Sequence, residues 1–411
     1  MEKTLVAKPQ SWLQSLARKL VLGQLEKLPN GALRIEEPDG NTLTLGDGSE
    51  PAVIVMNDWD AYRMMMSGGS LGAAEAYMEQ CWESPDLVAV IRYFAANVDE
   101  MDALEGGLAL LARPALKWLH TYNRNSLRGS RRNISAHYDL GNDFFSLFLD
   151  RSMMYSSAVF PDPDASLEDA SEHKMDLICR KLDLREGMTV LEVGTGWGGL
   201  ALHAAQHYGV QVTTTTISRE QARYARDKVR EAGLENRITV LEQDYRELTG
   251  QYDRVVSVEM IEAVGANYLD GYFRILGERL KPDGLLLLQA ITVPDQRYDY
   301  ALSQVDFIKR YIFPGGFLPS VSVMCEGLAE HTRLVVTGLE DIGMHYAQTL
   351  NAWRERFLKA LPHIGKLGFD DRFIRMWDYY LCYCEGAFLE RAISTVHLLA
   401  AGPTYRPTPS R

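Results

Sequence analysis

The feature that most constrains this chain is the segment 188–199, which reads M-T-V-L-E-V-G-T-G-W-G-G. Strand-forming residues at 189–193 run directly into glycines at 194, 196, 198 and 199, and a predicted helix at 200–208 follows. Glycine permits tight turns and close approach of the backbone to a ligand, and the start of a helix presents unpaired N–H groups. The segment therefore predicts a small-molecule loop at the carboxyl end of a parallel strand, although a turn that serves only packing has the same glycines.

Strand and helix patterns alternate after residue 188. The predicted strands are 189–193, 212–216, 238–243, 254–258 and 284–291, and the predicted helices between them are 200–208, 219–232 and about 266–280. Later strands are expected at 334–337 and 394–399, and later helices at 351–361 and 370–389. This order is typical of a doubly wound, Rossmann-like α/β domain that binds its ligands at the carboxyl ends of the strands.

Residues 1–105 predict a small N-terminal α+β domain without a catalytic motif. We expect a helix at 11–26, strands at 32–36, 42–45 and 52–56 with a turn at 38–40, and helices at 59–66, 72–83 and 87–96. A packing or dimerisation domain and a lipid- or partner-binding domain fit this pattern equally well. The expected boundaries are 1–105, a linker at 106–138, and a catalytic domain at 139–411.

The linker at 106–138 is basic, in contrast to the rest of the chain. It has no Asp or Glu and carries Arg113, Lys117, Arg124, Arg128, Arg131 and Arg132 beside several leucines and a tryptophan. Such a segment is attracted to anionic lipid headgroups by ~1 kcal/mol per basic residue, although a solvated linker has a similar composition. We predict that reversing the charges of Arg128, Arg131 and Arg132 weakens sedimentation with anionic vesicles.

The composition limits the classes of partner and the compartment. A net charge of −12 over 411 residues argues against nucleic acid as the main partner. The five cysteines form no regular framework, which favours a reducing compartment, and Cys382 and Cys384 are too close and isolated for a metal site, so none is expected. No signal peptide and no run of ~18 apolar residues is evident. We therefore expect a cytoplasmic protein.

The segment after the second predicted strand, 215–221, bears on the cofactor. An NAD site would place an acidic residue at the end of this strand, and none is present there. Ser218 and Gln221 fit the S-x-x-Q capping box at the start of a helix. The glycine loop is therefore better suited to a cofactor other than NAD.

Polar residues also follow the third and fourth predicted strands. Asp244 and Tyr245, a polar and an aromatic residue, can flank an adenine. Glu259 and Glu262 lie three apart in an apolar stretch, where burial without partners is costly. Glu262 is therefore a candidate site residue, with a helix-end or surface position as the alternative.

Six motifs together resemble one known family. They are H-Y-D-L-G-N-D-F-F (137–145), M-Y-S-S-A-V-F (154–160), L-E-V-G-T-G-W-G-G (191–199), S-V-E-M-I-E-A-V-G (257–265), F-I-K-R-Y-I-F-P-G-G (307–316) and C-E-G-A-F (384–388). From about 136 to 399 the chain resembles the cyclopropane fatty acid synthases, within the S-adenosylmethionine-dependent methyltransferases. The resemblance implies a class I methyltransferase domain that transfers a methylene group to the cis double bond of an unsaturated phospholipid acyl chain.

The resemblance also implies the position of the cofactor. Its contacts for S-adenosylmethionine fall on Tyr155, Ser156, Glu192, Val193, Gly194, Gly196, Trp197, Gly198, Thr216, Ile217, Ser218, Gln221, Asp244, Tyr245 and Arg246. His137 and Asp139 lie in a segment that the family uses to cover the cofactor. The protein is expected to work at the inner face of the membrane as a peripheral enzyme, with a homodimer as a candidate assembly.

A second group implied by the resemblance is a bicarbonate ion, which deprotonates the carbocation formed by methyl transfer. Its ligands fall on Ser157, Glu262, Gln289, Ile291 and Tyr346. Ser157 stands where the family usually has Cys, and Gln289 where it usually has His, although both can hydrogen-bond an anion. These departures leave a methyl-branched or methylene product open. A small-molecule methyltransferase and a non-catalytic lipid-binding module are more distant alternatives.

Cys384 corresponds to a conserved thiol of the family, which makes it a third catalytic candidate beside Glu262 and Tyr346. It also shares one predicted helix face with Trp377, Tyr380 and Phe388, which is typical of a core position. The expected chemistry needs no covalent enzyme intermediate. We therefore predict that Cys384→Ser retains measurable activity.

Overall fold

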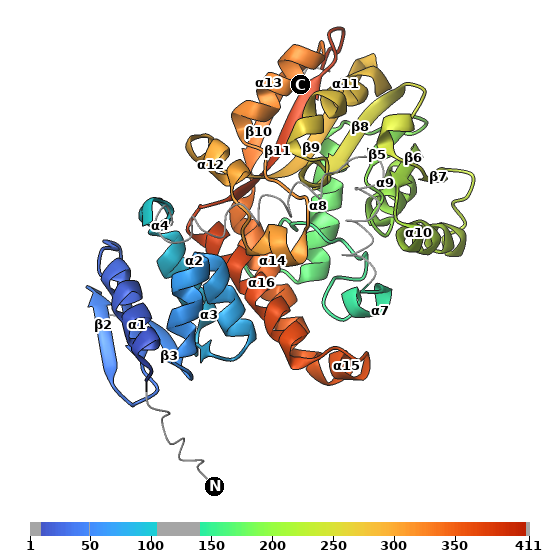
Figure 1. Ribbon diagram of the computed structural model, residues 1–411. Coiled ribbons are helices and arrows are strands. Elements are labelled where there is room, and N and C mark those ends of the chain that lie inside the picture. The colour runs from blue at the N-terminus through green and yellow to red at the C-terminus, as the bar shows by residue number, and fades with distance from the viewer. Residues whose placement is uncertain (1–9, 49, 105–139, 408–411) are drawn as a thin grey trace. The chain divides into compact units, whose positions relative to one another are not determined.

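A computed structural model describes residues 10–48, 50–104 and 140–407 (Figure 1). The expected basic linker, with its charge-reversal positions, and His137 and Asp139 lie outside these residues. The chain divides into two compact units. The first contains the N-terminal region with residues 305–310 and 361–392, and the second contains most of the remainder. This division differs from the expected boundaries, which placed all of 139–411 in one domain.

The first unit is built on a four-stranded sheet in the order β2-β1-β3-β4. Its elements are α1 (Trp12–Leu25), β1 (Ala32–Glu36), β2 (Thr42–Gly46), β3 (Ala52–Met56), α2 (Asp60–Met78), β4 (Trp82–Glu83), α3 (Leu87–Ala95) and α4 (Val98–Leu104). The three predicted strands and the turn at 38–40 are confirmed, with β1 antiparallel to β2 and parallel to β3. The two helices predicted at 59–66 and 72–83 correspond to the two halves of α2, which the non-helical backbone of Gly69 separates, although the second half ends at Met78.

The C-terminal helix α16 (Asp371–Leu389), preceded by α15 (Leu361–Lys366), belongs to this first unit. Its Tyr379 ring lies 5.5 Å from the ring of Tyr77, and Arg375 lies over the same ring at 4.0 Å. An added Cβ at Gly386 would lie 2.7 Å from Ile91, so α16 and α3 are in close contact. Because α16 buries its aromatic face against α2 and α3, it packs with the N-terminal elements despite its late place in the sequence.

The second unit is a seven-stranded sheet in the order β10-β11-β9-β8-β5-β6-β7. Its strands are β5 (Thr189–Val193), β6 (Gln211–Thr216), β7 (Ile238–Glu242), β8 (Tyr252–Val258), β9 (Leu280–Thr292), β10 (Val335–Asp341) and β11 (Ser394–Ala401). The strands from β5 to β9 pair in parallel, whereas β11 is antiparallel to both β9 and β10. The predicted doubly wound α/β domain is therefore confirmed.

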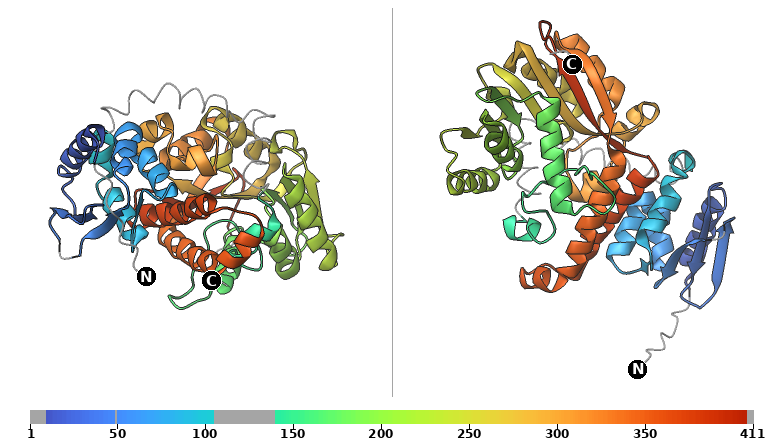
Figure 2. Two further views of the ribbon diagram at one scale, coloured as in Figure 1. Left: turned by 60° about the horizontal axis from the view of Figure 1, so that its bottom comes forward. Right: turned by 180° about the vertical axis from the view of Figure 1, so that it is seen from behind.

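Helices cover both faces of this sheet (Figure 2). On one face, apolar residues of α8 (Leu167–Lys181), α9 (Gly199–Tyr208) and α10 (Arg219–Glu231) form a core with β5 and β6. On the other face, α11 (Leu269–Arg279) and α13 (Val321–His331) pack on β8, β9 and β11. The unit also contains α7 (Asn142–Phe145), α12 (Tyr298–Ser303) and α14 (Gly343–Lys359).

Four helices of this unit, α7, α8, α12 and α13, were not anticipated from the sequence. The start of α8 is marked by a complete capping box in which Ser166 and Asp169 exchange side-chain to backbone hydrogen bonds. In the described part of the chain, no helix has the length and apolarity that crossing a bilayer requires.

Candidate active site

The glycine loop begins where β5 ends and leads into α9. Gly194, Gly196 and Gly198 have φ values of +107°, +51° and +93°, which L side chains rarely adopt. The first turn of α9 has no side-chain cap, and no described residue lies within 4 Å of a Cβ added at Gly196. The N–H groups of Gly194 and Thr195 donate to the Thr215 carbonyl at 3.1 and 3.0 Å, which ties the loop to β6. The open space at Gly196 lets a polar ligand, such as the carboxylate end of S-adenosylmethionine, approach the backbone closely.

Glu192, predicted to contact the cofactor, is connected to the loop through Thr214 and Thr195. Its buried carboxyl accepts a hydrogen bond of 2.5 Å from Thr214 Oγ1, which also lies 2.7 Å from Thr195 Oγ1. Burial raises the pKa of Glu192 to about 8. Val193 is buried beside it.

The end of β6 is held by side chains predicted as cofactor contacts. Ser218 caps α10 by accepting a hydrogen bond from Gln221 N at 3.3 Å. The Gln221 side chain contacts Thr216 Oγ1 at 2.9 Å, so the predicted capping box is only half formed. Ile217, between them, is half-buried.

A partly buried ion pair follows the end of β7. Asp244 accepts hydrogen bonds from Arg246 Nε at 2.8 Å and Nη2 at 2.7 Å, and this pairing raises the pKa of Arg246. The Arg246 guanidinium also lies over the Tyr245 ring at 5.4 Å. The predicted polar and aromatic residues are therefore together at the carboxyl edge of the sheet.

The segment before α8 lies against the loop through aromatic rings. Trp197 Nε1 donates to Asn142 Oδ1 at 2.7 Å. The Phe145 ring lies 5.1 Å from Trp197 and 5.2 Å from Tyr155. Tyr155 in turn lies 5.4 Å from Trp353 and 6.3 Å from Phe313, which places an aromatic wall beside the cofactor loop.

Glu259, which follows β8, is the centre of a hydrogen-bonded group. Its carboxylate accepts hydrogen bonds from Ser157 N at 3.0 Å, Gln289 Nε2 at 2.8 Å and Tyr346 Oη at 2.8 Å. Its own N–H donates to the Gln289 carbonyl at 2.8 Å, and its φ is +47°. We refer to the three donors to the carboxylate as the carboxylate cradle.

The carboxylate cradle is made of three residues that the family resemblance assigned to bicarbonate. In this chain they hold the carboxylate of Glu259, and the Ser157 hydroxyl donates instead to the carbonyl of Ala158 at 2.9 Å. These residues therefore do not fit a separate bicarbonate ion, because their hydrogen-bond donors already bind the Glu259 carboxylate. The sequence analysis noted Glu259 only as one of two closely spaced acids and assigned the role to Glu262.

Glu262 occupies a different position beside the cradle. Its Oε1 accepts a hydrogen bond of 2.6 Å from Ile291 N, so these two residues, both expected to bind bicarbonate, bind each other. Its Oε2 is buried and has no hydrogen-bond partner among the described residues. Burial, reinforced by the charge of Glu259, raises the pKa of Glu262 to about 8, so Glu262 is a neutral acid at neutral pH.

Lys174 on α8 is a site residue that the sequence analysis missed. It is fully buried, and its ammonium donates to Ser156 Oγ at 2.7 Å. Burial lowers the pKa of Lys174 to about 8, while the nearby carboxylates of Glu259, Asp150 and Glu192 oppose that shift. Burial likewise raises the pKa of Glu259, and the positive charge of Lys174 counteracts it. Lys174 therefore helps to keep Glu259 ionised.

A second unanticipated group orients Gln289. His397 Nε2 lies 3.0 Å from Gln289 Oε1, and His397 Nδ1 lies 2.7 Å from Lys181 Nζ. Burial and the two neighbouring lysines lower the pKa of His397 to about 2, so the ring is neutral. Because an ammonium only donates, Nδ1 is the acceptor and Nε2–H donates to Gln289. This fixes the Gln289 amide with its NH₂ toward Glu259.

Cys384, the remaining predicted catalytic residue, lies on α16 in the first unit. Burial raises the pKa of its thiol far above the usual range, which disfavours the nucleophilic thiolate. The prediction that Cys384→Ser retains activity therefore gains a physical reason and stays a prediction.

The fold and the loop define a class of protein, the S-adenosylmethionine-dependent methyltransferases. The cyclopropane synthase MmaA2 from Mycobacterium tuberculosis has a TM-score of 0.62 and 31% identity, with 66% of this chain and 98% of that chain covered. The mycolic acid cyclopropane synthase CmaA1, solved with SAH and CTAB, gives the same values.

Sequence comparison places the chain within one family of this class. The family model for mycolic acid cyclopropane synthetase matches residues 125–398, and the chain belongs to that family. The cyclopropane-fatty-acyl-phospholipid synthase of Escherichia coli K12 is 40% identical over 84% of this chain and 87% of its own length. The tuberculostearic acid methyltransferase UfaA1 of Mycobacterium tuberculosis is 37% identical over 91% and 88%.

Proposed function

We propose that this enzyme methylates the cis double bond of an unsaturated phospholipid acyl chain, with Glu259 as the base that removes the resulting proton. The observation that carries the proposal is the position of the Glu259 carboxylate, held by the three donors of the carboxylate cradle beside an aromatic wall. Relatives that share the family include both a cyclopropane synthase and methyltransferases of other lipids.

The residues of the site suit methyl transfer to an alkene, which is a poor nucleophile. An alkene needs a strong electrophile, and bound S-adenosylmethionine would supply one as an activated methyl group. Methyl transfer leaves a positive charge on the acyl chain, which the faces of Tyr155, Phe313 and Trp353 can stabilise by ~2 kcal/mol or more in a dry site. Glu259 then accepts a proton from the cation, and the electrons of the broken C–H bond form the new C–C bond.

The identity of the lost proton determines the product. Loss from the transferred methyl group closes a cyclopropane ring, which is the product we propose. A second candidate is a chain with a methylene group, formed when a hydride moves to the neighbouring carbon before the methyl group loses a proton. A saturated methyl branch would require a later reduction of this methylene group by a separate hydride donor. Because three hydrogen bonds fix the Glu259 carboxylate, the position of the acyl chain against it determines which proton is lost. The second candidate is supported by the names of relatives, including sphingolipid C9-methyltransferase A of Emericella nidulans.

Expression in a host that lacks such lipids tests the activity. Mass spectrometry of the fatty acids should show the gain of one CH₂, and NMR should show ring protons for a cyclopropane or vinylidene protons for a methylene group. Unchanged fatty acids, despite folded protein that binds S-adenosylmethionine, would contradict the proposal.

The role of Glu259 can be tested by chemical rescue. Glu259→Gly empties the carboxylate cradle and suits the positive φ of that residue, so the backbone should persist. Removal of a general base typically costs 10²–10⁴-fold in turnover. Added bicarbonate or formate should restore part of the activity of Glu259→Gly, but neither should rescue Glu259→Gln, in which the side chain still occupies the cradle. A wild-type enzyme that depends on added bicarbonate would overturn the assignment.

We also propose that the enzyme takes its substrate from a phospholipid surface as a peripheral protein of the cytoplasmic face. An exposed apolar face on α1 supports this, because Trp12, Leu13, Leu16 and Leu20 are 73%, 47%, 45% and 38% exposed. Exposed aromatic and leucine side chains on one face of a helix are typical of interfacial binding. A homodimer formed through the N-terminal unit is compatible with the same face.

A further inference from the structure

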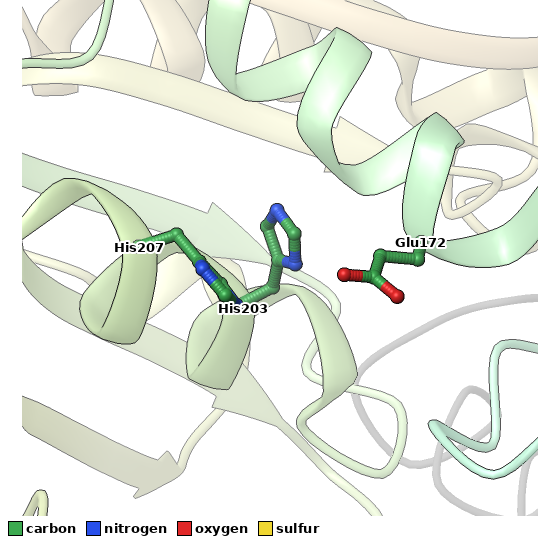
Figure 3. Close-up of side chains that lie close together, drawn as sticks. All are labelled: Glu172, His203 and His207. Atoms are coloured by element: carbon green, nitrogen blue, oxygen red, sulfur yellow. The ribbon is translucent and has the colours of Figure 1, made fainter. Parts of the chain in front are cut away.

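A cluster of metal-binding side chains lies between α8 and α9, on side chains that the proposed chemistry does not use. His203 and His207 lie one turn apart on α9, and Glu172 projects toward them from α8 (Figure 3). One ligand atom from each residue lies within 4.8 Å of the other two, and the two imidazole centroids are 4.5 Å apart. Residues four apart on a helix share one face, which brings both imidazoles to the same side.

His203 is a buried side chain with an unsatisfied ring nitrogen. The residue is only 7% exposed, and its Nε2 is buried without a hydrogen-bond partner among the described residues. A buried polar nitrogen in this state costs free energy unless something binds there.

The surroundings leave space and negative charge for a cation. The cluster borders an open pocket of about 400 Å³, which is also lined by His173, Asp176 and Tyr208. Asp176 accepts a hydrogen bond of 2.6 Å from Tyr208 Oη and pairs with Arg180 at 2.7 Å. It is therefore held as a nearby carboxylate, while the pocket has room for a water molecule in a further coordination position.

We propose that Glu172, His203 and His207 bind a divalent transition-metal ion, with Zn²⁺ as the best match. Two imidazoles and a carboxylate suit Zn²⁺ and similar ions, whereas Mg²⁺ prefers oxygen ligands alone. The proposal does not rest on the proposed function. The sequence predicts no metal, because Cys382 and Cys384 are too close for a metal site and the H-x-x-x-H spacing lies within a predicted helix.

A metal at this position would fasten two helices that serve the active site from elsewhere on their surfaces. α8 carries Lys174, two residues after Glu172, and α9 starts directly from the glycine loop. Binding to the folded state alone raises stability in proportion to the logarithm of metal concentration. The site is therefore expected to be structural, and its occupancy should appear in thermal unfolding.

The test is metal titration of the chelator-treated full chain. Isothermal titration with Zn²⁺ should give one equivalent bound, and the thermal midpoint should rise with Zn²⁺ but not with Mg²⁺. Co²⁺ should give the visible d–d absorption of a low-coordinate site with nitrogen ligands. His207→Ala and Glu172→Gln change exposed side chains and should fold, yet each should weaken Zn²⁺ binding at least tenfold.

His363→Ala is the matched control, because His363 is an exposed histidine on α15 outside the cluster. It should bind Zn²⁺ like the native chain. The proposal is overturned if the native chain binds no Zn²⁺. It is also overturned if His207→Ala and Glu172→Gln, with native circular dichroism, keep full affinity, since the ion would then bind elsewhere.

Discussion

Glu259 shows how one residue can redefine a site. Its φ of +47° is uncommon for a residue with a side chain, and such conformations cost of order 1–3 kcal/mol. Three hydrogen bonds to its carboxylate and one from its own N–H hold it in place. The strain is consistent with a residue placed for chemistry rather than for stability, because the site keeps an unfavourable backbone to present a carboxylate.

At the same scale, Lys174 should set the pH dependence of the reaction. The buried ammonium lowers the pKa of Glu259, so its loss in Lys174→Met raises that pKa. A base must be deprotonated to act, and the acidic limb of the kcat/KM profile should therefore move to higher pH. The profile is measured beside Lys228→Met, which changes a lysine on α10 whose side chain is 42% exposed. If kcat/KM falls by the same factor at every pH and the acidic limb does not shift, Lys174 only stabilises the fold.

Glu262 should make the cofactor-free protein less stable as the pH rises. Its pKa is about 8 in the folded state against an ordinary value of 4.5, so folding favours the protonated form. The stabilising contribution is complete below pH 4.5 and is lost as the pH rises through about 8. Glu262→Gln cannot lose this contribution. The thermal midpoint of the variant minus that of the wild type should therefore become larger between pH 5 and pH 9.

The same variant should also separate catalysis from binding. Glu262→Gln should lower turnover while leaving the affinity for S-adenosylmethionine nearly unchanged, measured by isothermal titration. A midpoint difference that is constant with pH would show that Glu262 is already ionised in the folded protein.

At the scale of elements, β11 and α8 supply the support behind the carboxylate cradle. β11 pairs antiparallel with β9 and places His397 directly opposite Gln289. α8 supplies both Lys181, which contacts His397, and Lys174, which contacts Ser156. The orientation of the Gln289 amide therefore depends on a helix residue, Lys181, and a strand residue, His397, that are 216 residues apart in the sequence.

His397→Phe should loosen the cradle without removing a catalytic residue. The Gln289 amide loses the donor to its Oε1 and can rotate, which should lower kcat about tenfold, the effect of one hydrogen bond of about 1.4 kcal/mol. His397→Gln, which keeps a donor, should recover part of this loss. KM for S-adenosylmethionine should stay unchanged in both, and equal kcat values for the two variants would contradict a positioning role.

At the scale of the whole molecule, each compact unit combines segments that are distant in the sequence. The first unit takes α15 and α16 from the C-terminal third of the chain, and the second is completed by β11 after them. The exposed face of α1 belongs to the first unit, whereas the carboxylate cradle belongs to the second. Membrane attachment and chemistry should therefore be separable by mutation.

The double variant Trp12→Ser, Leu16→Ser should reduce sedimentation with anionic phospholipid vesicles. Full burial of each such side chain is worth about 1.5–3 kcal/mol, so partial insertion of both should contribute at least tenfold to the partition coefficient. Leu367→Ser is the control, because Leu367 is 44% exposed in the same unit but lies outside α1. Thermal unfolding should be little changed, and unaltered sedimentation of the double variant would exclude this face as the contact.

The sequence alone determined the class of fold and most of its elements. The alternation of strands and helices and the glycines after Val193 are local patterns, and the structure confirms the doubly wound sheet built on β5. The resemblance to the family also pointed to Ser157, Gln289, Ile291 and Tyr346 as residues of the site. Hydrophobic periodicity and glycine conformation depend on neighbours in the chain, and these properties are readable without coordinates.

Only the tertiary structure decided which glutamate occupies the carboxylate cradle and which side chains surround it. Glu259 and Glu262 are equivalent in local pattern, but β8 directs the first into the carboxylate cradle and the second toward Ile291. Lys174, His397 and the Glu172–His203–His207 cluster carry no distinctive local signal, since each is defined by a partner on another element. The charge, burial and hydrogen bonding of a side chain are properties of its three-dimensional neighbours, which the order of residues does not specify by itself.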